Sequence, residues 1–322
     1  MYSVCFAGGG NNLRLAVLYG GTSSERDVSL VSGRTITQAL ADAGHNVTPL
    51  EWSEREVVER ADELNGFDLI FLGYHGGMGE DGRVQATLEL LGIPFTGSGS
   101  AASVLGMNKA FSKLLFREHN IPTADWVVVS HDTSLDEIIR RAEAGVGYPI
   151  AVKPASEGST IGFSRVDSPD NLPYAVENAR KYDKYVIVER FIEGRELTVG
   201  IIGDKPLPLV EIVPKHGIYD YECKYTHGMS AYLCPAPVDD ETVQKAQKYA
   251  LNAYRVLGCR NYARVDFRMD NRGRLYCLEV NTLPGMTNLS LVPMAAAEAG
   301  LSFTDLLDTI AEDAVTYFEA KE

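Results

Sequence analysis

The chain has 322 residues, of which 45% are hydrophobic and 23% are charged, so it is long enough for two or three domains with cores of their own. A net charge of −14 argues against nucleic acid as the main partner, although a local basic pocket for an anionic ligand stays open. Its apolar runs fall short of the ~18 residues that a membrane-spanning helix needs, and residues 1–7 lack the basic n-region of a signal peptide. Five cysteines without a C-x-x-C pair indicate reduced thiols. We therefore expect a cytoplasmic protein that binds neither membrane nor nucleic acid.

The first hundred residues are predicted to alternate between strands and helices. The apolar run at 13–19 predicts a buried strand, and a helical pattern follows over 28–43 with Gly44 as its C-cap. The elements predicted next are a strand at 67–72, a glycine-rich loop at 73–82, a helix at 83–91 and a short strand at 93–96. Such alternation is typical of a parallel sheet covered by helices, so we predict an N-terminal parallel α/β domain over 13–107.

The rest of the chain is predicted to form two further units of α+β character, which makes the fold α/β overall. The predicted elements are a helix at 109–119, strands at 126–129, 150–153 and 186–189, a helix at 241–257, a β-hairpin about 270–274 and a helix at 303–318. We divide this part into a central domain, 108–195, and a C-terminal domain, 196–322. Binding sites are then expected in the clefts between the three domains.

Charged and amide side chains are predicted to face one another across the hairpin. The turn signal at 270–274 places Asp266 opposite Glu279 and Arg264 opposite Asn281, and all four then share one face. Two carboxylates about 4 Å apart repel by several kcal/mol at an effective dielectric constant of ~20. A hard divalent cation such as Mg²⁺ removes that repulsion. The alternative is an ordinary solvated hairpin whose charges happen to align.

A phosphate-binding loop is predicted after the strand at 150–153. Lys153 ends this strand, and the small residues at 154–162 can offer backbone N–H groups to phosphate oxygens. The alternative is a surface loop with a solvated lysine. The G-x-G-x-x-A match at 97–102 is a weaker nucleotide signal, because no convincing ribose-binding acid closes a short βαβ unit after it. The chain has no Gly-Lys dipeptide and so no Walker A motif.

Six short motifs stand in order along the chain. They are YGGTSSERDVS at 19–29, HGGMGEDGRVQ at 75–85, VKPASEGSTIG at 152–162, YDYECKY at 219–225, RVD at 264–266 and EVNTLPGMT at 279–287. In order and spacing they resemble the D-alanine–D-alanine ligases of the ATP-grasp superfamily. The likeness extends from about residue 13 to the last predicted helix, and it implies a three-domain ATP-grasp architecture.

The resemblance implies an ATP-dependent ligase that makes D-alanyl-D-alanine for peptidoglycan precursors. In that reaction the carboxylate of a first D-alanine attacks the γ-phosphate of ATP and forms an acyl phosphate. The amine of a second D-alanine then attacks the acyl carbon, and the tetrahedral intermediate expels phosphate. The implied partners are D-alanine, ATP, two Mg²⁺ (or Mn²⁺) ions and a second copy of the chain in a homodimer.

The resemblance also implies the residues of the ATP site. The positions that match metal ligands are Asp266, Glu279 and Asn281. The lysines that match contacts to the ATP phosphates are Lys109, Lys153 and Lys224. The acids that match adenine and ribose recognition are Glu189 and Glu196. Considered without the resemblance, these two acids would be solvated charges at strand edges.

Further positions match the family's substrate sites. Glu25 matches the acid that binds the first D-alanine's ammonium, although by itself it fits a helix-start charge. Ser159 and Tyr225 match its hydrogen-bond partners, which close a lid and exclude water from the acyl phosphate. The pair that matches the oxyanion-stabilising groups is Arg264 and the backbone N–H of Gly285. The positions that match the second-substrate site are Ser290, Leu291 and His75. His75 could equally be a structural loop histidine.

The aromatic segment from 214 to 235 is predicted to form a packed lid. In the resemblance, a tyrosine at 225 goes with dipeptide ligases, which implies an amine rather than D-lactate as the second nucleophile. Two positions depart from the family pattern. Ser156 stands where many relatives have a basic residue, and Asn261 stands where glycine is common, though asparagine tolerates a left-handed backbone. The alternative functions are a ligase that joins D-alanine to D-lactate or D-serine and a non-catalytic ATP-binding regulator. The metal-site carboxylates and Arg264 argue against the regulator.

Overall fold

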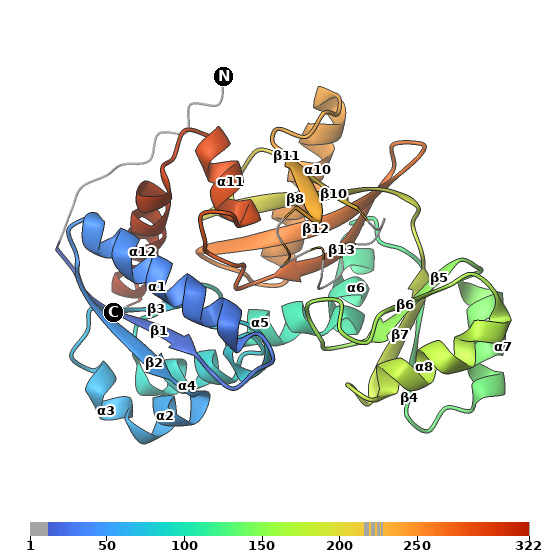
Figure 1. The fold of residues 1–322 in the computed structure, drawn as a ribbon, viewed down its shortest axis with the longest axis horizontal. Coiled ribbons are helices and arrows are strands. Elements are labelled where there is room, and N and C mark those ends of the chain that lie inside the picture. Colours follow the sequence, from blue (N-terminus) through green and yellow to red (C-terminus); the bar gives the residue numbers. More distant parts are fainter. Residues whose placement is uncertain (1–11, 216–218, 220–222, 224–225, 227, 322) are drawn as a thin grey trace.

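The computed structural model describes residues 12–215, 219, 223, 226 and 228–321, and its strands form three separate sheets (Figure 1). The N-terminal sheet has the strand order β2-β1-β3, and both pairs are parallel. Its strands are β1 (Arg14–Gly20), β2 (Asn46–Trp52) and β3 (Leu69–Leu72). The predicted parallel sheet near the N-terminus is therefore confirmed.

The short strand predicted at 93–96 is wrong. Within the described residues, Phe95 forms an isolated parallel bridge with Ile70 and no ladder follows it. Pro94 has no N–H to donate, and Gly97, at φ +87°, turns the chain toward the next helix. The sheet path consequently ends at β3.

Helices cover the N-terminal sheet and lead toward the centre of the molecule. They are α1 (Arg26–Asp42), α2 (Glu54–Glu59), α3 (Ala61–Leu64), the 3₁₀ helix η1 (Gly77–Gly79), α4 (Arg83–Leu91) and α5 (Ser100–Met107). Gly33 brings α1 against β1, because a Cβ at this position would lie 2.1 Å from the ring of Tyr19. Close packing of α1 on the sheet thus depends on the missing side chain.

The central sheet is antiparallel with the strand order β4-β7-β5-β6. Its strands are β4 (Trp126–Ser130), β5 (Ile150–Pro154), β6 (Ser164–Val166) and β7 (Tyr185–Arg190). The helices of this part are α6 (Lys109–Glu118), α7 (Leu135–Gly145), η2 (Pro169–Asn171) and α8 (Leu172–Arg180). Side chains from β4 to β7 and from α7 and α8 form a core whose buried members all lie between residues 129 and 188.

The C-terminal sheet has the order β11-β10-β8-β12-β13, with β9 added beside β8. Its strands are β8 (Gly194–Ile202), β9 (Lys205–Pro206), β10 (Val210–Pro214), β11 (Ser230–Leu233), β12 (Tyr262–Asp270) and β13 (Leu275–Asn281). The helices are α10 (Asp240–Val256), α11 (Leu291–Glu298) and α12 (Phe303–Glu319). Ala246, Ala250 and Ala253 bury one face of α10 against this sheet.

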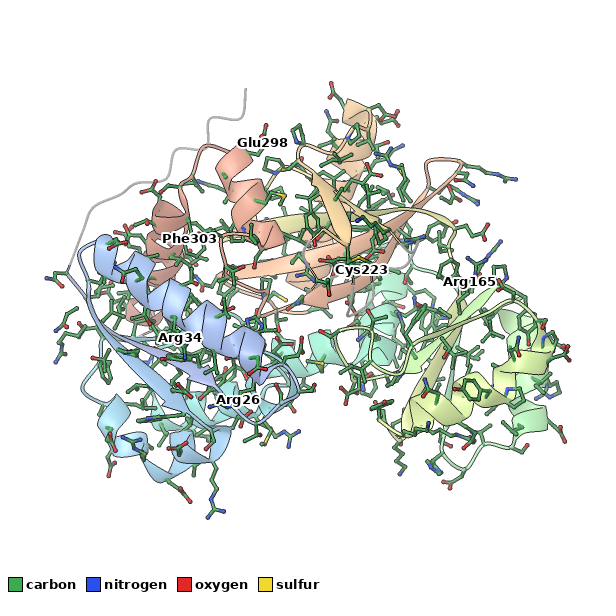
Figure 2. All side chains as sticks on the ribbon, viewed as in Figure 1. Arg26, Arg34, Arg165, Cys223, Glu298 and Phe303 are labelled. Atoms are coloured by element: carbon green, nitrogen blue, oxygen red, sulfur yellow. The ribbon has the colours of Figure 1, made fainter. Side chains whose placement is uncertain are left out.

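The last helix returns to the beginning of the chain. α12 packs against α1 and β3, and one hydrophobic cluster contains residues of the N-terminal sheet together with Leu306, Leu307 and Ile310 of α12. Figure 2 shows side chains filling the space between these layers, with Phe303 labelled at the start of α12. α6 lies between the central and C-terminal sheets (Figure 1) and contacts β13. All three parts therefore meet near the N-terminus of α6.

No helix among the described residues combines the length and the apolar character needed to cross a membrane.

Candidate active site

The hairpin of β12 and β13 has the predicted register at the four predicted positions. Asp266 pairs with Glu279, and Arg264 pairs with Asn281. If the register of these pairs continued to the turn, Asp270 would lie opposite Leu275. Instead Met269 pairs with Leu275, so β13 has one residue more than β12 between these pairs and the turn. A β-bulge after Asp266 absorbs the extra residue, so the predicted pairs are confirmed although the predicted turn centre is displaced.

The bulge also changes which side chains reach the cavity. Phe267 pairs with Cys277, which leaves Leu278 opposite no residue of β12. As a result, the consecutive residues Leu278 and Glu279 both line one cavity, an arrangement that strict alternation along a strand forbids. The bulge thus places an apolar side chain beside a carboxylate on the same wall.

Ionic contacts hold the carboxylates of this face. Arg264 donates two hydrogen bonds of 2.9 Å to the two oxygens of Asp266, and the hydroxyl of Thr198 donates to Asp266 Oδ1 at 2.6 Å. Burial lowers the pKa of Arg264, but the adjacent Asp266 carboxylate outweighs burial and raises it above its ordinary value. Lys109 Nζ lies 3.1 Å from Glu279 Oε2. The two carboxylates are therefore each neutralised by one cation.

The donor set of this face fits a hard divalent cation. It offers two carboxylates and the amide of Asn281, and oxygen ligands of this kind suit Mg²⁺ or Mn²⁺. Among the described residues, no three His, Cys, Asp or Glu side chains gather closely enough to hold a metal by themselves. Protein groups alone thus leave positions that phosphate oxygens can fill, as is usual for Mg²⁺ bound with a nucleotide.

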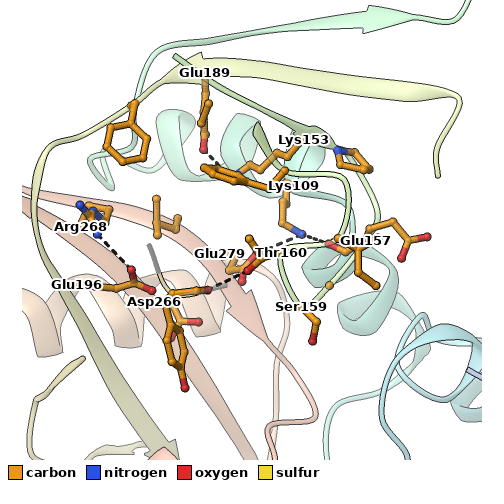
Figure 3. A pocket seen from close by; sticks show the side chains of 18 of the residues that line it. Lys109, Lys153, Glu157, Ser159, Thr160, Glu189, Glu196, Asp266, Arg268 and Glu279 are labelled. Carbon is orange, nitrogen blue, oxygen red and sulfur yellow. Dashed lines mark hydrogen bonds and ion pairs between the residues drawn. The ribbon is translucent and has the colours of Figure 1, made fainter. Parts of the chain in front are cut away.

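The predicted phosphate loop follows β5 and is held by the start of α6. Asn108 caps α6 by accepting from the backbone N–H groups of Ala110 and Phe111, and its amide donates to Ser156 Oγ at 3.3 Å. Lys109 Nζ donates to the carbonyl of Glu157 at 2.6 Å (Figure 3). Ser156, which stands where many relatives were expected to have a basic residue, therefore belongs to the anchor of the loop.

The tip of the loop contacts both other parts of the chain. Ser159 and Thr160 have left-handed backbones with φ of +49° and +63°. The hydroxyl of Ser159 donates to the carboxylate of Glu25, which precedes α1 and is buried. The hydroxyl of Thr160 donates to the carbonyl of Tyr219 at 3.0 Å. The loop is thus fixed to the N-terminal part on one side and to the segment after β10 on the other.

Glu189 on β7 is a buried carboxylate shared by two lysines. Its Oε1 lies 2.6 Å from Lys153 Nζ, and its Oε2 lies 3.0 Å from Lys113 Nζ. Burial raises the pKa of Glu189, but the two ammonium groups outweigh burial and bring it to about 2. Burial lowers the pKa of Lys113, whereas Glu189 and Glu279 outweigh burial at Lys153 and raise its pKa. Glu189 and Lys153 are therefore charged at neutral pH, and the contact with Glu189 opposes the effect of burial on Lys113.

A first cavity lies between the central and C-terminal sheets (Figure 3). Its polar wall contains Glu196, which lies 3.2 Å from Arg268 NH1 on the neighbouring strand. The apolar side chains that line it are Ala151, Pro154, Ile161, Phe163, Phe191, Ile192 and Leu278. The predicted ATP-site residues that line it are Lys109, Lys153, Glu189, Glu196, Asp266 and Glu279.

A second cavity lies beside the first and shares a wall with it. The residues common to both cavities are Lys109, Gly158, Ser159, Tyr219 and Glu279. The predicted substrate residues that line the second cavity are Glu25, His75, Arg264, Gly285, Ser290 and Leu291, together with Asn281. The family resemblance implies these residues from distant segments of the sequence, and the fold brings them to one cavity.

Hydrogen bonds and a contact with one carboxylate hold the side chains of His75 and Ser290 in place in the second cavity. His75 Nε2 lies 2.9 Å from the hydroxyl of Ser32 on α1, and its Nδ1 lies 3.6 Å from Glu80. Ser290 Oγ accepts from the backbone N–H of Thr287 at 3.0 Å. A Cβ on Gly285 would lie 3.2 Å from Ser290 Oγ, so glycine keeps this backbone close to its neighbours.

Two predicted site residues, Lys224 and Tyr225, lie outside the described residues, as does Tyr221 of the predicted lid. The described tyrosines of this segment pack together, since the hydroxyls of Tyr219 and Tyr232 are 3.1 Å apart and their rings meet edge to face. Burial raises the pKa of Tyr219.

Two family models match the sequence. The model described as D-ala D-ala ligase C-terminus matches residues 115–312, which is more than half of the chain, and the model described as D-ala D-ala ligase N-terminus matches residues 51–98. The chain belongs to the D-alanine–D-alanine ligase family. Its members are ATP-dependent ligases, so the family inferred from the six motifs is confirmed.

Individual members of the family match over nearly the whole chain. D-alanine–D-alanine ligase B of Chromobacterium violaceum is 44% identical over 301 residues, which cover 92% of this chain and 97% of the relative. The structure of the Bacillus anthracis D-alanine–D-alanine ligase complexed with ATP has a TM-score of 0.82 at 32% identity, covering 96% of this chain and 100% of the other. VanG D-Ala:D-Ser ligase from Enterococcus faecalis also has a TM-score of 0.82, at 27% identity, over 94% of this chain and 100% of its own. The ATP-grasp architecture expected from the motifs is therefore confirmed.

Sequence reasoning missed four residues of this ligase that contact the predicted site. Lys113 follows Lys109 by one helical turn, and Arg268 continues the alternation of Arg264 and Asp266 along β12. These two spacings are signals that could have been used. Thr198 could not be found in this way, because its place beside Asp266 depends on the pairing of β8 with β12. Leu278 depends on the bulge.

Proposed function

We propose that the chain joins two D-alanines to D-alanyl-D-alanine, with ATP hydrolysed to ADP and phosphate, and so supplies a peptidoglycan precursor. The observation that carries this proposal is the wall common to the two cavities, where Lys109 and Glu279 stand between the first cavity, lined by Lys153 and Glu196, and the second, lined by Glu25 and Arg264. A carboxylate bound on one side of this wall and a γ-phosphate bound on the other would be neighbours. Family membership supports the same reaction.

The first cavity is proposed to bind ATP. Lys109, Lys153 and Lys224 would neutralise the phosphates, and the loop at 154–162 would donate backbone N–H groups to them. Glu189 is assigned to adenine and Glu196 to ribose. The apolar pair Phe191 and Leu278 supports a planar base in this cavity.

We assign the divalent cations to Asp266, Glu279 and Asn281. Two Mg²⁺ ions, or Mn²⁺ in their place, would supply electrophilic stabilisation of the transferring phosphoryl group. Arg264, which donates to Asp266, would then face the substrate cavity that it already lines.

The second cavity is proposed to hold both amino acids. The carboxylate of Glu25 would accept hydrogen bonds from the ammonium of the first D-alanine. Ser159 and Tyr225 would hold the Glu25 carboxylate and close the lid. Arg264 and the N–H of Gly285 would stabilise the oxyanion of the tetrahedral intermediate, which is typically worth several kcal/mol. Ser290 and the N–H of Leu291 would bind the second carboxylate. His75, held by Ser32, would border that site.

A second candidate is the ligation of D-alanine to D-serine or D-lactate. The similarity to VanG D-Ala:D-Ser ligase supports it, since the same architecture serves a different second substrate in that protein. Tyr225 favours formation of the D-alanine dipeptide over ligation to D-lactate.

The test is phosphate release from Mg·ATP with D-alanine alone, with L-alanine, and with D-alanine plus D-serine or D-lactate, with products identified by mass. We expect release that requires D-alanine and yields its dipeptide. Preferential formation of the mixed product at neutral pH would transfer the assignment to the second candidate. ATP binding without turnover in any mixture would contradict both and favour a regulator.

We also propose that the chain works in the cytoplasm as a homodimer and that its domains span 13–107, 108–195 and 196–322. Light scattering of the purified chain tests the dimer.

A further inference from the structure

Lys113 is a buried cation that the proposed reaction does not use. It lies on α6 one turn after Lys109, its side chain is 0% exposed, and it does not line either cavity. Its ammonium donates to the hydroxyl of Thr123 at 2.6 Å, and this hydroxyl donates to the carbonyl of Cys277 on β13 at 2.7 Å. The ring of Trp126 lies 5.1 Å from the same ammonium. Lys113 is thus held between the central and C-terminal sheets.

Two lysines share the carboxylate of Glu189, but only one of them reaches the nucleotide cavity. Lys153 lies 2.6 Å from Oε1 and its side chain lines the cavity, as Figure 3 shows. Lys113 lies 3.0 Å from Oε2 on the other side of the carboxylate. One partner of Glu189 therefore faces the ligand space, and the other is enclosed by protein.

This asymmetry matters if Lys153 binds phosphate. An ammonium that moves from Glu189 to a phosphate would leave a buried carboxylate without a counter-ion, which is strongly unfavourable. With Lys113 in place, Glu189 keeps a counter-ion throughout.

We propose that Lys113 is a positioning residue that holds Glu189 as a fixed counter-ion and thereby lets Lys153 exchange between Glu189 and the nucleotide phosphates. This inference rests on the proposed function, because it takes the first cavity as the ATP site. It assigns to Lys113 an effect on nucleotide affinity without any contact to the nucleotide.

The test compares Lys113→Met with Arg117→Met in the full-length protein by calorimetric titration with Mg·ADP. Arg117 is the matched control, since it lies one turn further along α6 and its guanidinium also packs on Trp126, at 4.8 Å, while its side chain is exposed. We expect K113M to weaken ADP binding about tenfold or more and R117M to change it less than twofold. The KM for D-alanine should stay within twofold in both variants.

A second comparison separates the charge argument from a merely structural one. In a Glu189→Gln background the carboxylate that needs a counter-ion is gone, and the pair K113M/E189Q replaces both buried charges with neutral groups. We expect K113M to change ADP affinity less than twofold in this background. This comparison remains available if K113M alone fails to fold.

Equal weakening by K113M in the wild-type and E189Q backgrounds would overturn the proposal, and so would ADP affinity of K113M within twofold of R117M. Failure of the wild-type protein to bind Mg·ADP at all would instead overturn the assignment of the first cavity to ATP.

Discussion

Single buried polar residues connect the parts of this molecule. Asn261 precedes β12, is 4% exposed and has a left-handed backbone with φ of +66°, as its tolerance of that conformation predicted. Its amide oxygen accepts from the N–H of Gly97 at 2.7 Å, and its amide nitrogen donates to Ile310 and Asp313 of α12 at 2.9 and 2.8 Å. One side chain therefore joins the N-terminal part, β12 and α12.

Two replacements of Asn261 should separate the effect of its side-chain hydrogen bonds from the effect of its left-handed backbone. Asn261→Ala removes the side-chain hydrogen bonds and also strains the backbone, so we expect a loss of about 3 kcal/mol or more in the free energy of unfolding. Asn261→Gly removes the same bonds without the strain and should be about 1 kcal/mol more stable than the alanine variant. Urea unfolding of both variants measures the difference. Equal stability of the two would contradict the strain argument.

The buried carboxylate of Glu189 should make stability depend on pH. Its pKa of about 2 lies below the ordinary value of 4.5, so its ion pairs contribute stability above pH 4.5 and lose it as the pH falls toward 2. The shift corresponds to about 3 kcal/mol at most. We expect the wild-type protein to exceed Glu189→Gln in unfolding free energy at pH 7 and the gap to shrink between pH 5 and pH 3. A gap that stays constant over this range would show that the pairing does not stabilise the fold.

Among the elements, the hairpin illustrates what the sequence can and cannot predict. Alternation and a turn signal, both local properties of the chain, predicted the pairing of Asp266 with Glu279, but this pairing holds only because the bulge offsets the displaced turn. No local signal predicts the bulge at Leu278, next to which the N–H of Cys277 donates to the carbonyl of Pro122 before β4. The sequence patterns also did not predict β2, because this strand is mostly exposed and carries Pro49.

The N-terminal cap of α6 links an element to the site. Asn108→Ala removes the cap from two backbone N–H groups and should cost about 1 kcal/mol of stability. It also removes the contact to Ser156, so we expect the KM for ATP to rise severalfold. Ser134→Ala, which removes the cap of α7, is the matched control. It should cost similar stability and leave the KM for ATP unchanged, as steady-state kinetics would show.

At the scale of the whole molecule, one hydrophobic core combines residues from both ends of the chain. The central sheet has a core made only of its own residues, whereas the N-terminal sheet shares a cluster with α11 and α12. Sequence analysis divides the chain into consecutive segments and so cannot reveal that the last helix completes the first domain.

This difference predicts how fragments behave. A fragment of residues 122–195 contains every buried member of the main core cluster of the central sheet and should unfold cooperatively. A fragment of residues 12–107 lacks Leu306, Leu307 and Ile310 and should expose the surface that they cover. We expect it to be unfolded or aggregated by circular dichroism and size-exclusion chromatography. A stable, monomeric N-terminal fragment would show that α12 is not required for its core.

The tip of the loop at 154–162 combines backbone strain with contacts to two other parts of the chain. Ser159 and Thr160 hold left-handed backbones that cost about 1–2 kcal/mol each, and their side-chain contacts go to Glu25 and to the Tyr219 carbonyl. If these contacts break, both residues can return to ordinary conformations, so the backbone strain offsets part of the free energy that the two contacts contribute. The loop is thus held in its observed conformation by a smaller net free energy than its contacts alone would give, which favours reversible opening.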